Sequence, residues 1–466
     1  MQFNLRLLEA HAVELKKLVL ACPETEGAAY MLCGSARIGA DPWDGAARTV
    51  LLSHAVLAVP ASEMLSVSAV HVTWSTASFV KLLRRSKLEG LVPAVVHSHP
   101  NGPAEFSLQD DKNEAELFRL TQNRNGQRAE LLSMIITGAG DVVARLWTGN
   151  GPPVRIGDVT EVGQRLKIHG RVAAADEAVL SRQALALGPE VNHILKGLKI
   201  GIVGLSGTGS PTAVLLTRLG VGSLALIEKD VIDFSNLNRV HGSRRADAVA
   251  KLPKAHALAR EIAAMDLGTR VATFEHWVSD PACHDALKAC DVIFGCTDDH
   301  DGRLLLNRFA YFYAVAVIDM GLAIDPRPER GMRDMSGRVS VVLPGAPCLL
   351  CRGIVDPVQA REDDLQRRNP QEYERRQREG YVRGSRAPAP AVVTFTTETA
   401  CMAVNELLQV LVDFRGTGGW VWQRRRRFDL CEDRRPGSRS DPDCPMCSSA
   451  EMWGRGDVEP FLDRVG

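Results

Sequence analysis

Residues Lys199-Ile-Gly-Ile-Val-Gly204-Leu-Ser-Gly-Thr-Gly-Ser210 decide the fold of the larger part of this chain. The apolar run predicts a short buried strand, and the glycines predict a tight turn into a helix with Pro211 in its first turn. The run Ser223-Leu-Ala-Leu-Ile227 predicts the next strand, and Glu228 follows it. Glu228 lies 24 positions after the first glycine of the turn, near the roughly 20 expected for a ribose-binding carboxylate. The stretch therefore predicts a parallel β-α-β unit whose helix N-terminus binds phosphate.

The glycine-rich turn by itself fits NAD, FAD or ATP, and Ser206 replaces the middle glycine of G-x-G-x-x-G. The segments that narrow this choice are Ser181-Arg182-Gln183, Asp233-Phe-Ser-Asn-Leu-Asn-Arg239, Leu252-Pro-Lys254-Ala255 and Phe294-Gly-Cys-Thr-Asp298 with Arg303 and Asn307. In content and order they resemble the ThiF/MoeB adenylyltransferases and the ubiquitin-activating enzymes built on the same fold. The resemblance covers about residues 180–450.

The resemblance implies a doubly wound, Rossmann-like domain that uses ATP and Mg²⁺ to adenylate the C-terminal carboxylate of a small protein. Charge develops on phosphate oxygens in this reaction, so cations must be held there in advance. By resemblance Arg239 and Lys254 are those cations, Asp298 helps to hold Mg²⁺, and Glu228 takes the ribose hydroxyls where the family more often has aspartate. Arg182 would reach the nucleotide of the partner subunit in a homodimer. The implied nucleotide-binding set is Arg182, Gly204, Gly207, Gly209, Glu228, Asp230, Asn236, Arg239, Lys254 and Asp298.

A second chemical signature is His97-Ser98-His99-Pro100, with Ser107 and Asp110 behind it. The run Pro93-Ala-Val-Val96 predicts a buried strand that enters the first histidine, and alternate strand residues share a face, so both imidazoles would lie side by side. With Asp110 as a third ligand, one position is left for water, which is the pattern of a catalytic zinc. Two alternatives are structural histidines on the strand and a plain helix capping box from Ser107 to Asp110.

This segment resembles the JAMM (MPN-type) metallo-isopeptidases, whose signature is Glu…H-S-H-P-x6-S-x-x-D. The resemblance implies that His97, His99 and Asp110 bind zinc and that the Ser107 hydroxyl steadies the developing oxyanion. The family's general base is an upstream glutamate in a strand that enters an L-x-G turn. We choose Glu26 over Glu24 because Glu26 directly precedes the apolar strand, although its spacing to the turn is one residue longer than expected.

Four of the eleven cysteines form two C-x2-C pairs with 92 residues between them. Cys348, Cys351, Cys444 and Cys447 together suit a closed tetrahedral thiolate site, which is the structural kind of zinc site. Similar pairs occur at the same places in ThiF/MoeB relatives. Redox activity is the alternative, but neither pair opens a helix after a strand.

Thioester-forming members of that family carry a nucleophilic cysteine after the first pair, and residues 352–400 contain none. Cys401 lies in a segment patterned as a packed helix, and Cys431 follows a basic run that ends at Asp429. Neither is a convincing nucleophile, so we expect the reaction to stop at the acyl-adenylate or to pass it to another protein's thiol.

Length and composition predict two to four ordinary globular domains, since the chain has 466 residues, 45% of them hydrophobic and 24% charged. Basic and acidic residues balance at 56 each, so no global field recruits nucleic acid or membrane, and residues 424–427 are too few for a nucleic-acid patch.

No uncharged apolar run is long enough to span a bilayer. Residues 1–20 predict no signal peptide but an amphipathic helix through Leu5, Leu8, Leu15 and Leu18. The scattered cysteines then favour a cytoplasmic location.

We therefore expect an α/β protein with a mixed α/β JAMM-type domain at 1–150 and a doubly wound ThiF-type domain with a zinc knuckle at 181–466. Residues 151–180 carry few large apolar side chains and no strong strand, which predicts a linker or small connecting helices. Residues 361–379 are charged with both signs and predict a mobile loop or a solvated helix.

The expected function is zinc-dependent isopeptidase cleavage at, and ATP-dependent adenylation of, the C-terminal tail of a ubiquitin-like protein. A conjugating enzyme or a sulfur-transfer protein would be the further partner. Two alternatives stay open. One is activation and trimming of a sulfur carrier in cofactor or metabolite biosynthesis, and the other is a non-catalytic scaffold that binds ubiquitin-like folds.

Overall fold

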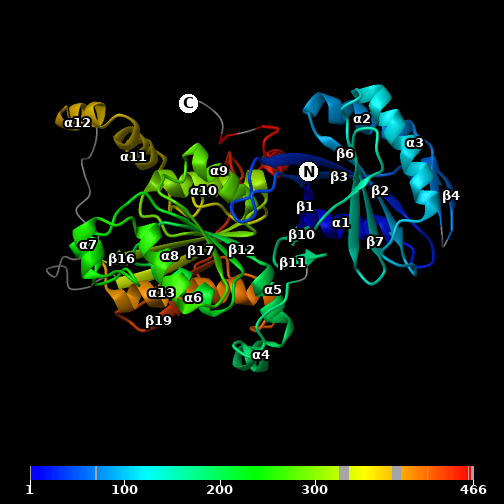
Figure 1. Cartoon of the computed structure of the whole chain (residues 1–466). Coiled ribbons are helices and arrows are strands. Elements are labelled where there is room, and N and C mark those ends of the chain that lie inside the picture. The colour runs from blue at the N-terminus through cyan, green and yellow to red at the C-terminus, as the bar shows by residue number, and fades with distance from the viewer. Residues whose placement is uncertain are drawn as a thin grey trace.

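The computed structural model describes residues 2–68, 71–171, 173–324, 335–379, 390–416, 418–459 and 461–462. Two lobes lie side by side, each built around one large sheet (Figure 1). The N-terminal lobe is a mixed α/β domain and the second is a doubly wound α/β domain, which confirms the predicted fold class.

In the described part of the chain the first sheet has nine strands in the order β11-β10-β1-β3-β2-β6-β7-β8-β9. They are β1 (Gln2–Leu8), β2 (Ala28–Ile38), β3 (Arg48–Ala58), β6 (Val92–His99), β7 (Leu131–Thr137), β8 (Val142–Trp147), β9 (Val154–Arg155), β10 (Val159–Val162) and β11 (Leu166–His169). A hairpin of β4 (Met64–Val67) and β5 (Val72–Trp74) stands apart from this sheet.

Helices cover both faces of the first sheet, and the alternation along β2 shows why. Ala29, Met31 and Cys33 pack in one apolar cluster with α1 (Glu9–Val19). Tyr30 and Leu32 point the other way and pack with α2 (Ala77–Glu89) and α3 (Leu108–Asn125). Successive strand residues face opposite sides, so a nearly continuous apolar strand serves two helical layers.

Two expectations for this domain are wrong. Residues 151–180 include β9, β10 and β11, and β10 pairs parallel with β1, so the first sheet extends to His169. Residues 2–8 form a strand, and only the helix from Glu9 onward matches the expected amphipathic helix. The strands β1 and β10 are fixed by pairing with distant segments and carry little local signal of their own. The strands β9 and β11 pair with their chain neighbours but are only 2 and 4 residues long.

Among the described residues the second sheet has eight strands in the order β14-β13-β12-β15-β16-β17-β18-β19. The first five strands in this order pair parallel, and the pairs from β16 to β19 are antiparallel. They are β12 (Lys199–Val203), β13 (Ser223–Ile227), β14 (Arg270–Phe274), β15 (Val292–Gly295), β16 (Ala316–Ile324), β17 (Met335–Val342), β18 (Gln423–Arg427) and β19 (Glu432–Arg434). The two strands predicted from the opening stretch are β12 and β13.

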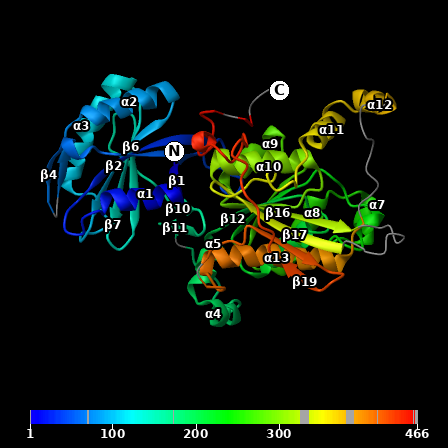
Figure 2. The same ribbon diagram turned by 180° about the vertical axis from the view of Figure 1, so that it is seen from behind.

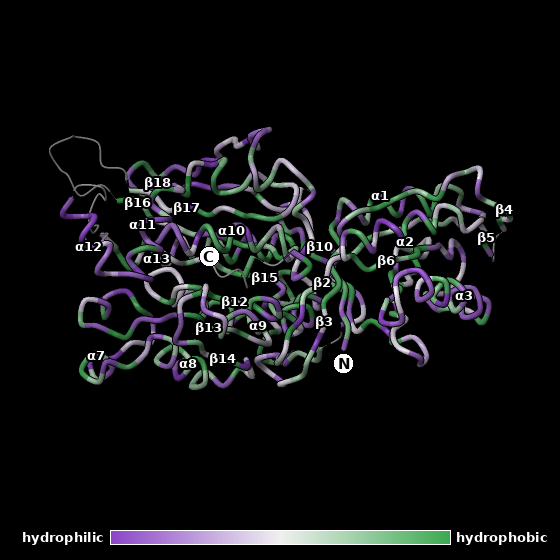
Figure 3. The backbone as a smooth tube through the Cα atoms, turned by 90° about the horizontal axis from the view of Figure 1, so that it is seen from above, coloured by the Kyte–Doolittle hydropathy of each residue, from purple (hydrophilic) through white to green (hydrophobic). Residues whose placement is uncertain are grey.

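Helices also cover both faces of this sheet. The helices α6 (Gly209–Arg218), α8 (Lys254–Met265) and α13 (Val393–Val412) share one core cluster with β12, while α9 (Pro281–Ala289) and α10 (His300–Tyr313) share another with β13. The hydropathy colouring shows hydrophobic central strands and a hydrophilic α12 (Figure 3). The remaining helices are α4 (Ser181–Leu187), α5 (Glu190–Gly197), α7 (Arg245–Ala250), α11 (Pro357–Arg368) and α12 (Pro370–Arg378).

The charged segment 361–379 forms α11 and α12, which agrees with the solvated-helix alternative. Asp356 and Asn369 cap these helices, and a proline follows each cap in the first turn. Both helices project from the side of the second domain that is remote from the first (Figure 2). Within the described residues no helix combines the length and apolarity that crossing a membrane requires.

Buried charges join the two domains. Arg6 on β1 donates to the carbonyl oxygens of Tyr313, Lys288 and Cys290 in the second domain, at 3.0, 2.7 and 2.8 Å. Lys199 of β12 in turn lies 2.6 Å from Asp41 of the first domain. A guanidinium buried in this way is compensated only while its acceptors stay in place.

Residues 453–458, here called the C-terminal strap, lie between the domains after the last cysteine. The strap pairs with β2, since the Asp457 amide donates to the Ser35 carbonyl at 2.7 Å. The Asp457 carboxylate accepts from the Arg37 amide (2.6 Å) on one side and from Tyr313 Oη (2.8 Å) and Lys288 Nζ (2.9 Å) on the other. Gly454, at φ +67°, lets this backbone pass close to the first domain.

We expect Asp457→Ala to lower the free energy of unfolding by about 2–4 kcal/mol, because it removes the partner of a largely buried lysine and strands two further donors. Urea denaturation checks the magnitude, and limited proteolysis should show faster cleavage between the domains. Glu116→Ala, at an exposed carboxylate of α3, is the matched control. Equal stability of the two variants would contradict the joining role of the strap.

Candidate functional sites: a nucleotide pocket and two metal clusters

The glycine-rich turn between β12 and α6 is shaped by contacts that no side chain would allow. Gly204 has φ +88°, and a Cβ there would lie 2.8 Å from the Cys296 carbonyl carbon. A Cβ on Gly209 would lie 1.8 Å from the Gly204 carbonyl oxygen. Gly207 approaches the side chains of Thr396 and Arg239. The turn therefore holds the N-terminus of α6 open toward the space above the sheet, where an anion can approach backbone amides.

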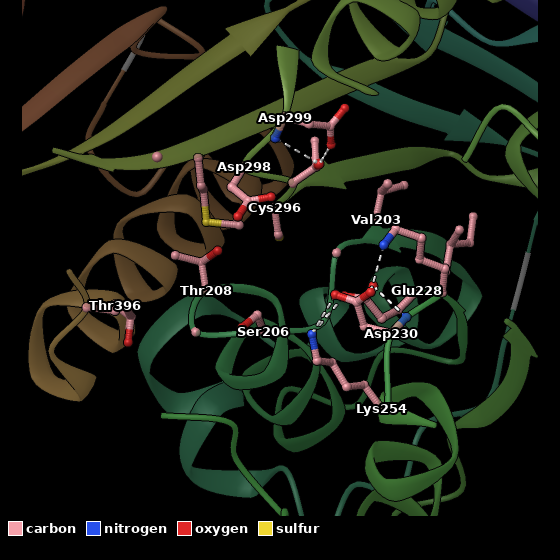
Figure 4. Close-up of a pocket in the computed structure, with 18 of the residues that line it drawn as sticks. Val203, Ser206, Thr208, Glu228, Asp230, Lys254, Cys296, Asp298, Asp299 and Thr396 are labelled. Atoms are coloured by element: carbon pink, nitrogen blue, oxygen red, sulfur yellow. Dashed lines mark hydrogen bonds and ion pairs between the residues drawn. The ribbon is translucent and has the colours of Figure 1, made fainter. Parts of the chain in front are cut away.

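A pocket of about 590 Å³ lies above this turn at the carboxyl ends of the parallel strands (Figure 4). Most of the expected nucleotide-binding residues line it, namely Gly204, Gly207, Glu228, Asp230, Asn236, Arg239, Lys254 and Asp298. Gly209 supports the turn from below. Arg182 lies on α4, exposed and outside the lining of this pocket.

Lys254 is the most confined cation of the pocket. Its side chain is only 7% exposed, and Nζ lies 3.1 Å from Asp230 Oδ2 and 3.8 Å from Glu228 Oε2. Burial opposes ionisation of Asp230, but hydrogen bonds and charge from Lys229 and Lys254 outweigh it and hold the pKa of Asp230 below its ordinary value. Figure 4 shows the ammonium group directed at both carboxylates. The cation is thus oriented before any ligand enters.

Glu228 is fixed by the turn itself. Its Oε2 accepts from the Leu205 amide at 3.0 Å, and its Oε1 accepts from the Asp230 amide at 3.1 Å. Asn236 uses its side-chain oxygen to accept from the Asp233 amide at 3.0 Å, which caps a short 3-10 turn. Arg239 donates to the Ser235 carbonyl and, at 3.2 Å, to Asn238.

The opposite wall of the pocket is acidic. Asp298 and Asp299 both line it, and Asp299 also caps α10 and accepts from the Thr297 hydroxyl. Arg303 donates to Asp319 at 3.2 Å, so it supports the wall. Sequence analysis missed Asp299, which directly follows Asp298 and was visible as a second acidic side chain.

Asn307, quoted among the family motifs, lies away from the pocket lining described above. Its side-chain oxygen accepts from the Leu349 amide at 2.8 Å, and Leu349 directly follows the first cysteine of the C-x2-C pairs. Asn307 therefore ties α10 to the cysteine cluster.

In the first domain, β6 ends in His97 and His99 and brings them to Asp110 in the first turn of α3. His97 Nε2 lies 3.3 Å from Asp110 Oδ1, and His99 Nε2 lies 3.7 Å from Asp110 Oδ2. His97 Nε2 is buried and makes no hydrogen bond among the described residues, while His99 Nδ1 bonds the Pro103 carbonyl at 3.0 Å. A bond at Nδ1 leaves Nε2 free as a metal ligand, so this donor set fits zinc.

The capping-box interpretation of Ser107 and Asp110 also holds. Ser107 caps α3 by accepting from the Asp110 amide, and Asp110 accepts from the Ser107 amide at 2.7 Å. Burial opposes ionisation of Asp110, but its contacts with His97 and Ser107 hold its pKa below the ordinary value. The cap and the ligand cluster thus use the same carboxylate.

Glu26 is the glutamate that reaches this cluster. Its side chain is buried, and Oε1 lies 3.8 Å from His99 Nε2, whereas Glu24 is exposed. Burial raises the pKa of Glu26 above its ordinary value, as suits a proton acceptor. His71 and Trp74 line the small cavity beside Glu26, and sequence analysis missed both.

The four paired cysteines meet in one cluster. The Sγ atoms of Cys348 and Cys444 lie 3.6 Å apart and those of Cys351 and Cys447 lie 3.5 Å apart. A tetrahedral zinc with bonds of about 2.3 Å sets neighbouring sulfurs about 3.8 Å apart, so these distances suit the metal. Backbone amides also approach two of the sulfurs, as they do for thiolates.

The two other cysteines considered above differ in their surroundings. Cys401 is half-buried on α13, and burial raises the pKa of its thiol, which lowers its thiolate fraction. Cys431 is exposed.

Comparison with known families decides the relationship. The ThiF family model matches residues 180–446, more than half of the chain. The chain belongs to the ThiF family. The model of prokaryotic homologues of the JAB domain matches residues 9–148, so the predicted fusion of a JAB-type domain with a ThiF domain is confirmed.

Three individual proteins show the extent of the similarity. The SAMP-activating enzyme E1 of Haloferax volcanii is 24% identical over 283 residues, which cover 59% of this chain and 88% of that protein. The sulfur carrier protein ThiS adenylyltransferase of Bacillus subtilis is 27% identical over 180 residues, 37% of this chain and 49% of that protein. Among solved structures, Escherichia coli MccB with MccA-N7isoASN is 17% identical, with TM-score 0.44, over 59% of this chain and 77% of that one.

We expect two zinc ions per chain that differ in access. The cysteine cluster should hold one ion firmly, while the ion at His97, His99 and Asp110 should yield to chelators first because a water position stays open. Elemental analysis of His97→Ala should show the loss of about one zinc per chain, and Cys444→Ser should lose the other. An unchanged zinc content in His97→Ala would remove the histidine site.

Proposed function

We propose that this chain activates the C-terminal carboxylate of a ubiquitin-like protein as an acyl-adenylate and that its JAB-type domain is a zinc isopeptidase acting on the same kind of tail. One observation carries the first half, namely Lys254, a nearly buried cation held by Glu228 and Asp230 at the mouth of the glycine-rich turn. The activity implied by the names of the relatives from Haloferax and Bacillus supports it.

In the proposed adenylation, the tail carboxylate oxygen attacks the α-phosphorus of ATP, and the bond to the β-phosphate breaks to release pyrophosphate. Backbone amides at the start of α6 bind the phosphates, and Lys254 and Arg239 offset the developing charge. Asp298 and Asp299 would hold Mg²⁺, which supplies a further Lewis acid at the phosphates. Glu228, immobilised by two backbone amides, is positioned to accept hydrogen bonds from the ribose.

The proposed isopeptidase reaction uses His97, His99 and Asp110 as zinc ligands. A zinc ion bound there would polarise the scissile carbonyl and acidify water. Glu26 then accepts the proton of the attacking water and delivers it to the leaving amine. The Ser107 hydroxyl at the N-cap of α3 faces the same cluster through its contact with Asp110 and would donate to the oxyanion.

The acceptor of the adenylate defines a second candidate function, the activation of a sulfur carrier, which the Bacillus relative favours. The cysteine-free interval 352–400 and the raised pKa of Cys401 support transfer to an outside thiol or sulfur donor in either case. We also propose a homodimer, in which the exposed Arg182 on α4 reaches the neighbouring nucleotide.

Lys254→Ala should reduce ATP–pyrophosphate exchange, measured with a matching ubiquitin-like protein, about 10²–10³-fold, because one preoriented charge is lost. Lys251→Ala is the matched control, since Lys251 is exposed and pairs with Asp233 outside the pocket. Equal rates for the two variants would refute the role of Lys254.

We expect no reductant-labile adduct on the enzyme in this assay. If an adduct forms and Cys401→Ala abolishes it, this chain is a thioester-forming enzyme.

Glu26→Gln should slow zinc-dependent cleavage of a ubiquitin-like protein extended at its C-terminus by about 10²–10⁴-fold, because the amide cannot accept a proton. Its zinc content should stay unchanged, since Glu26 is not among the three ligands. Glu24→Gln is the control and should cleave at the unsubstituted rate. If Glu24→Gln loses activity instead, the assignment of the base is wrong.

A further inference from the structure

The first turn of α3 carries Ser107 and Asp110 but has little apolar anchorage. Leu108, its first residue, is 80% exposed. The helix buries Glu114, Phe118 and Thr121, and among the described side chains its apolar packing begins only at Ala115, about two turns from its N-terminus. Something other than hydrophobic contact must therefore fix the end of the helix that faces the metal cluster.

Arg145 on β8 supplies that attachment. Its Nε donates to Glu114 Oε2 at 2.8 Å, and its Nη1 donates to Asp111 Oδ1 at 2.6 Å. Asp111 adjoins the ligand Asp110, and Glu114 lies one turn further along the same helix. Trp147, two residues along β8, also donates to Glu114 Oε2, at 2.7 Å. The strand β8 thus holds the first two turns of α3 in place through hydrogen bonds from the planar guanidinium group.

The same guanidinium also lies against the histidine side of the cluster. Its Cζ is 3.8 Å from the ring centroid of Phe106, the residue just before Ser107. The Phe106 ring in turn meets the His97 ring edge to face, with centroids 6.3 Å apart. Arg145 therefore contacts the neighbours of both Asp110 and His97 without touching either ligand.

The burial of Arg145 suggests that it serves to position the carboxylates of α3 more than to stabilise the fold. The residue is only 8% exposed, and within the described structure its Nη2 makes no hydrogen bond. Burying a cation costs free energy even when the cation is paired, and an apolar side chain of similar size is often as stable or more so. What an apolar side chain cannot do is hold two carboxylates at fixed positions.

We propose that Arg145 is a positioning residue that sets the separation of Asp110 from His97 and thereby the affinity of this cluster for zinc. This inference rests on the proposed isopeptidase and names a determinant of its metal site. Arg145 acts through the backbone of α3 and through Phe106, so its effect should be on metal retention at this site alone.

The test compares Arg145→Met, Arg145→Lys and the control Arg119→Met in the zinc-loaded full chain. Arg119 lies on the exposed face of the same helix, so its substitution removes an equal charge. Zinc transfer to a chromogenic chelator is followed in time, and the histidine site should release its ion in a fast phase and the cysteine cluster in a slow phase. We expect Arg145→Met to lower the zinc affinity of the histidine site about 10–100-fold, as losses of supporting contacts around metal ligands typically do, and to accelerate the fast phase accordingly.

Further results of this comparison separate positioning from general damage. Arg145→Lys should recover part of the retention, and Arg119→Met should release zinc at the unsubstituted rate. Equal acceleration of both phases in the Met and Lys variants would mean global destabilisation and would overturn the proposal, as would a fast phase unchanged in Arg145→Met. A zinc content that His97→Ala leaves unchanged would instead overturn the isopeptidase itself, and the role of Arg145 with it.

Discussion

The guanidinium of Arg6, a residue of the first domain, is buried in the second domain, and the arrangement of the two domains depends on this contact. All three of its acceptors are backbone carbonyls of the second domain, and burial, together with the nearby charge of Arg171, lowers the pKa of Arg6. If the Arg6 side chain moved into solvent, water would hydrate it. The three carbonyl oxygens would then lose their hydrogen-bond donor. The Asp457 carboxylate mirrors the arrangement, with donors from both domains. These hydrogen bonds join the two domains together with a shared apolar cluster, in which Ala36, Ile38, Val50 and Leu52 of the first domain pack against the second.

Both candidate sites share one physical strategy, which is to hold charge in place before a ligand arrives. Lys254 is immobilised between two carboxylates, and Asp110 is immobilised as a helix cap. In each case residues of one site hold one another, since Glu228 orients Lys254 and Ser107 orients Asp110. Such preorganisation lowers the reorganisation needed during reaction.

Sequence alone predicts what is local and chemically distinctive. The β-α-β unit around Gly204 is fixed by turn geometry within twelve residues, and the histidine and cysteine spacings constrain which side chains can meet. The strands at 154–169 were not predicted, because β10 exists through pairing with β1 at the other end of the domain, and β9 and β11 are very short strands that pair with their chain neighbours β8 and β10. Arg145 was equally hidden, since its partners lie on another element. A lone charge in the apolar run Val142–Trp147 was the available signal.

The strap also constrains the order in which the molecule can be completed during synthesis. Arg37 and Asp457, which bond directly, are 420 residues apart. At about 5–20 residues per second, a ribosome needs tens of seconds to connect them. Arg6 can reach its acceptors once Tyr313 has emerged, but Ser35 and Arg37 of β2 lack their strap partner until Asp457 follows. The last contacts of the first domain therefore form only after most of the second domain has been synthesised.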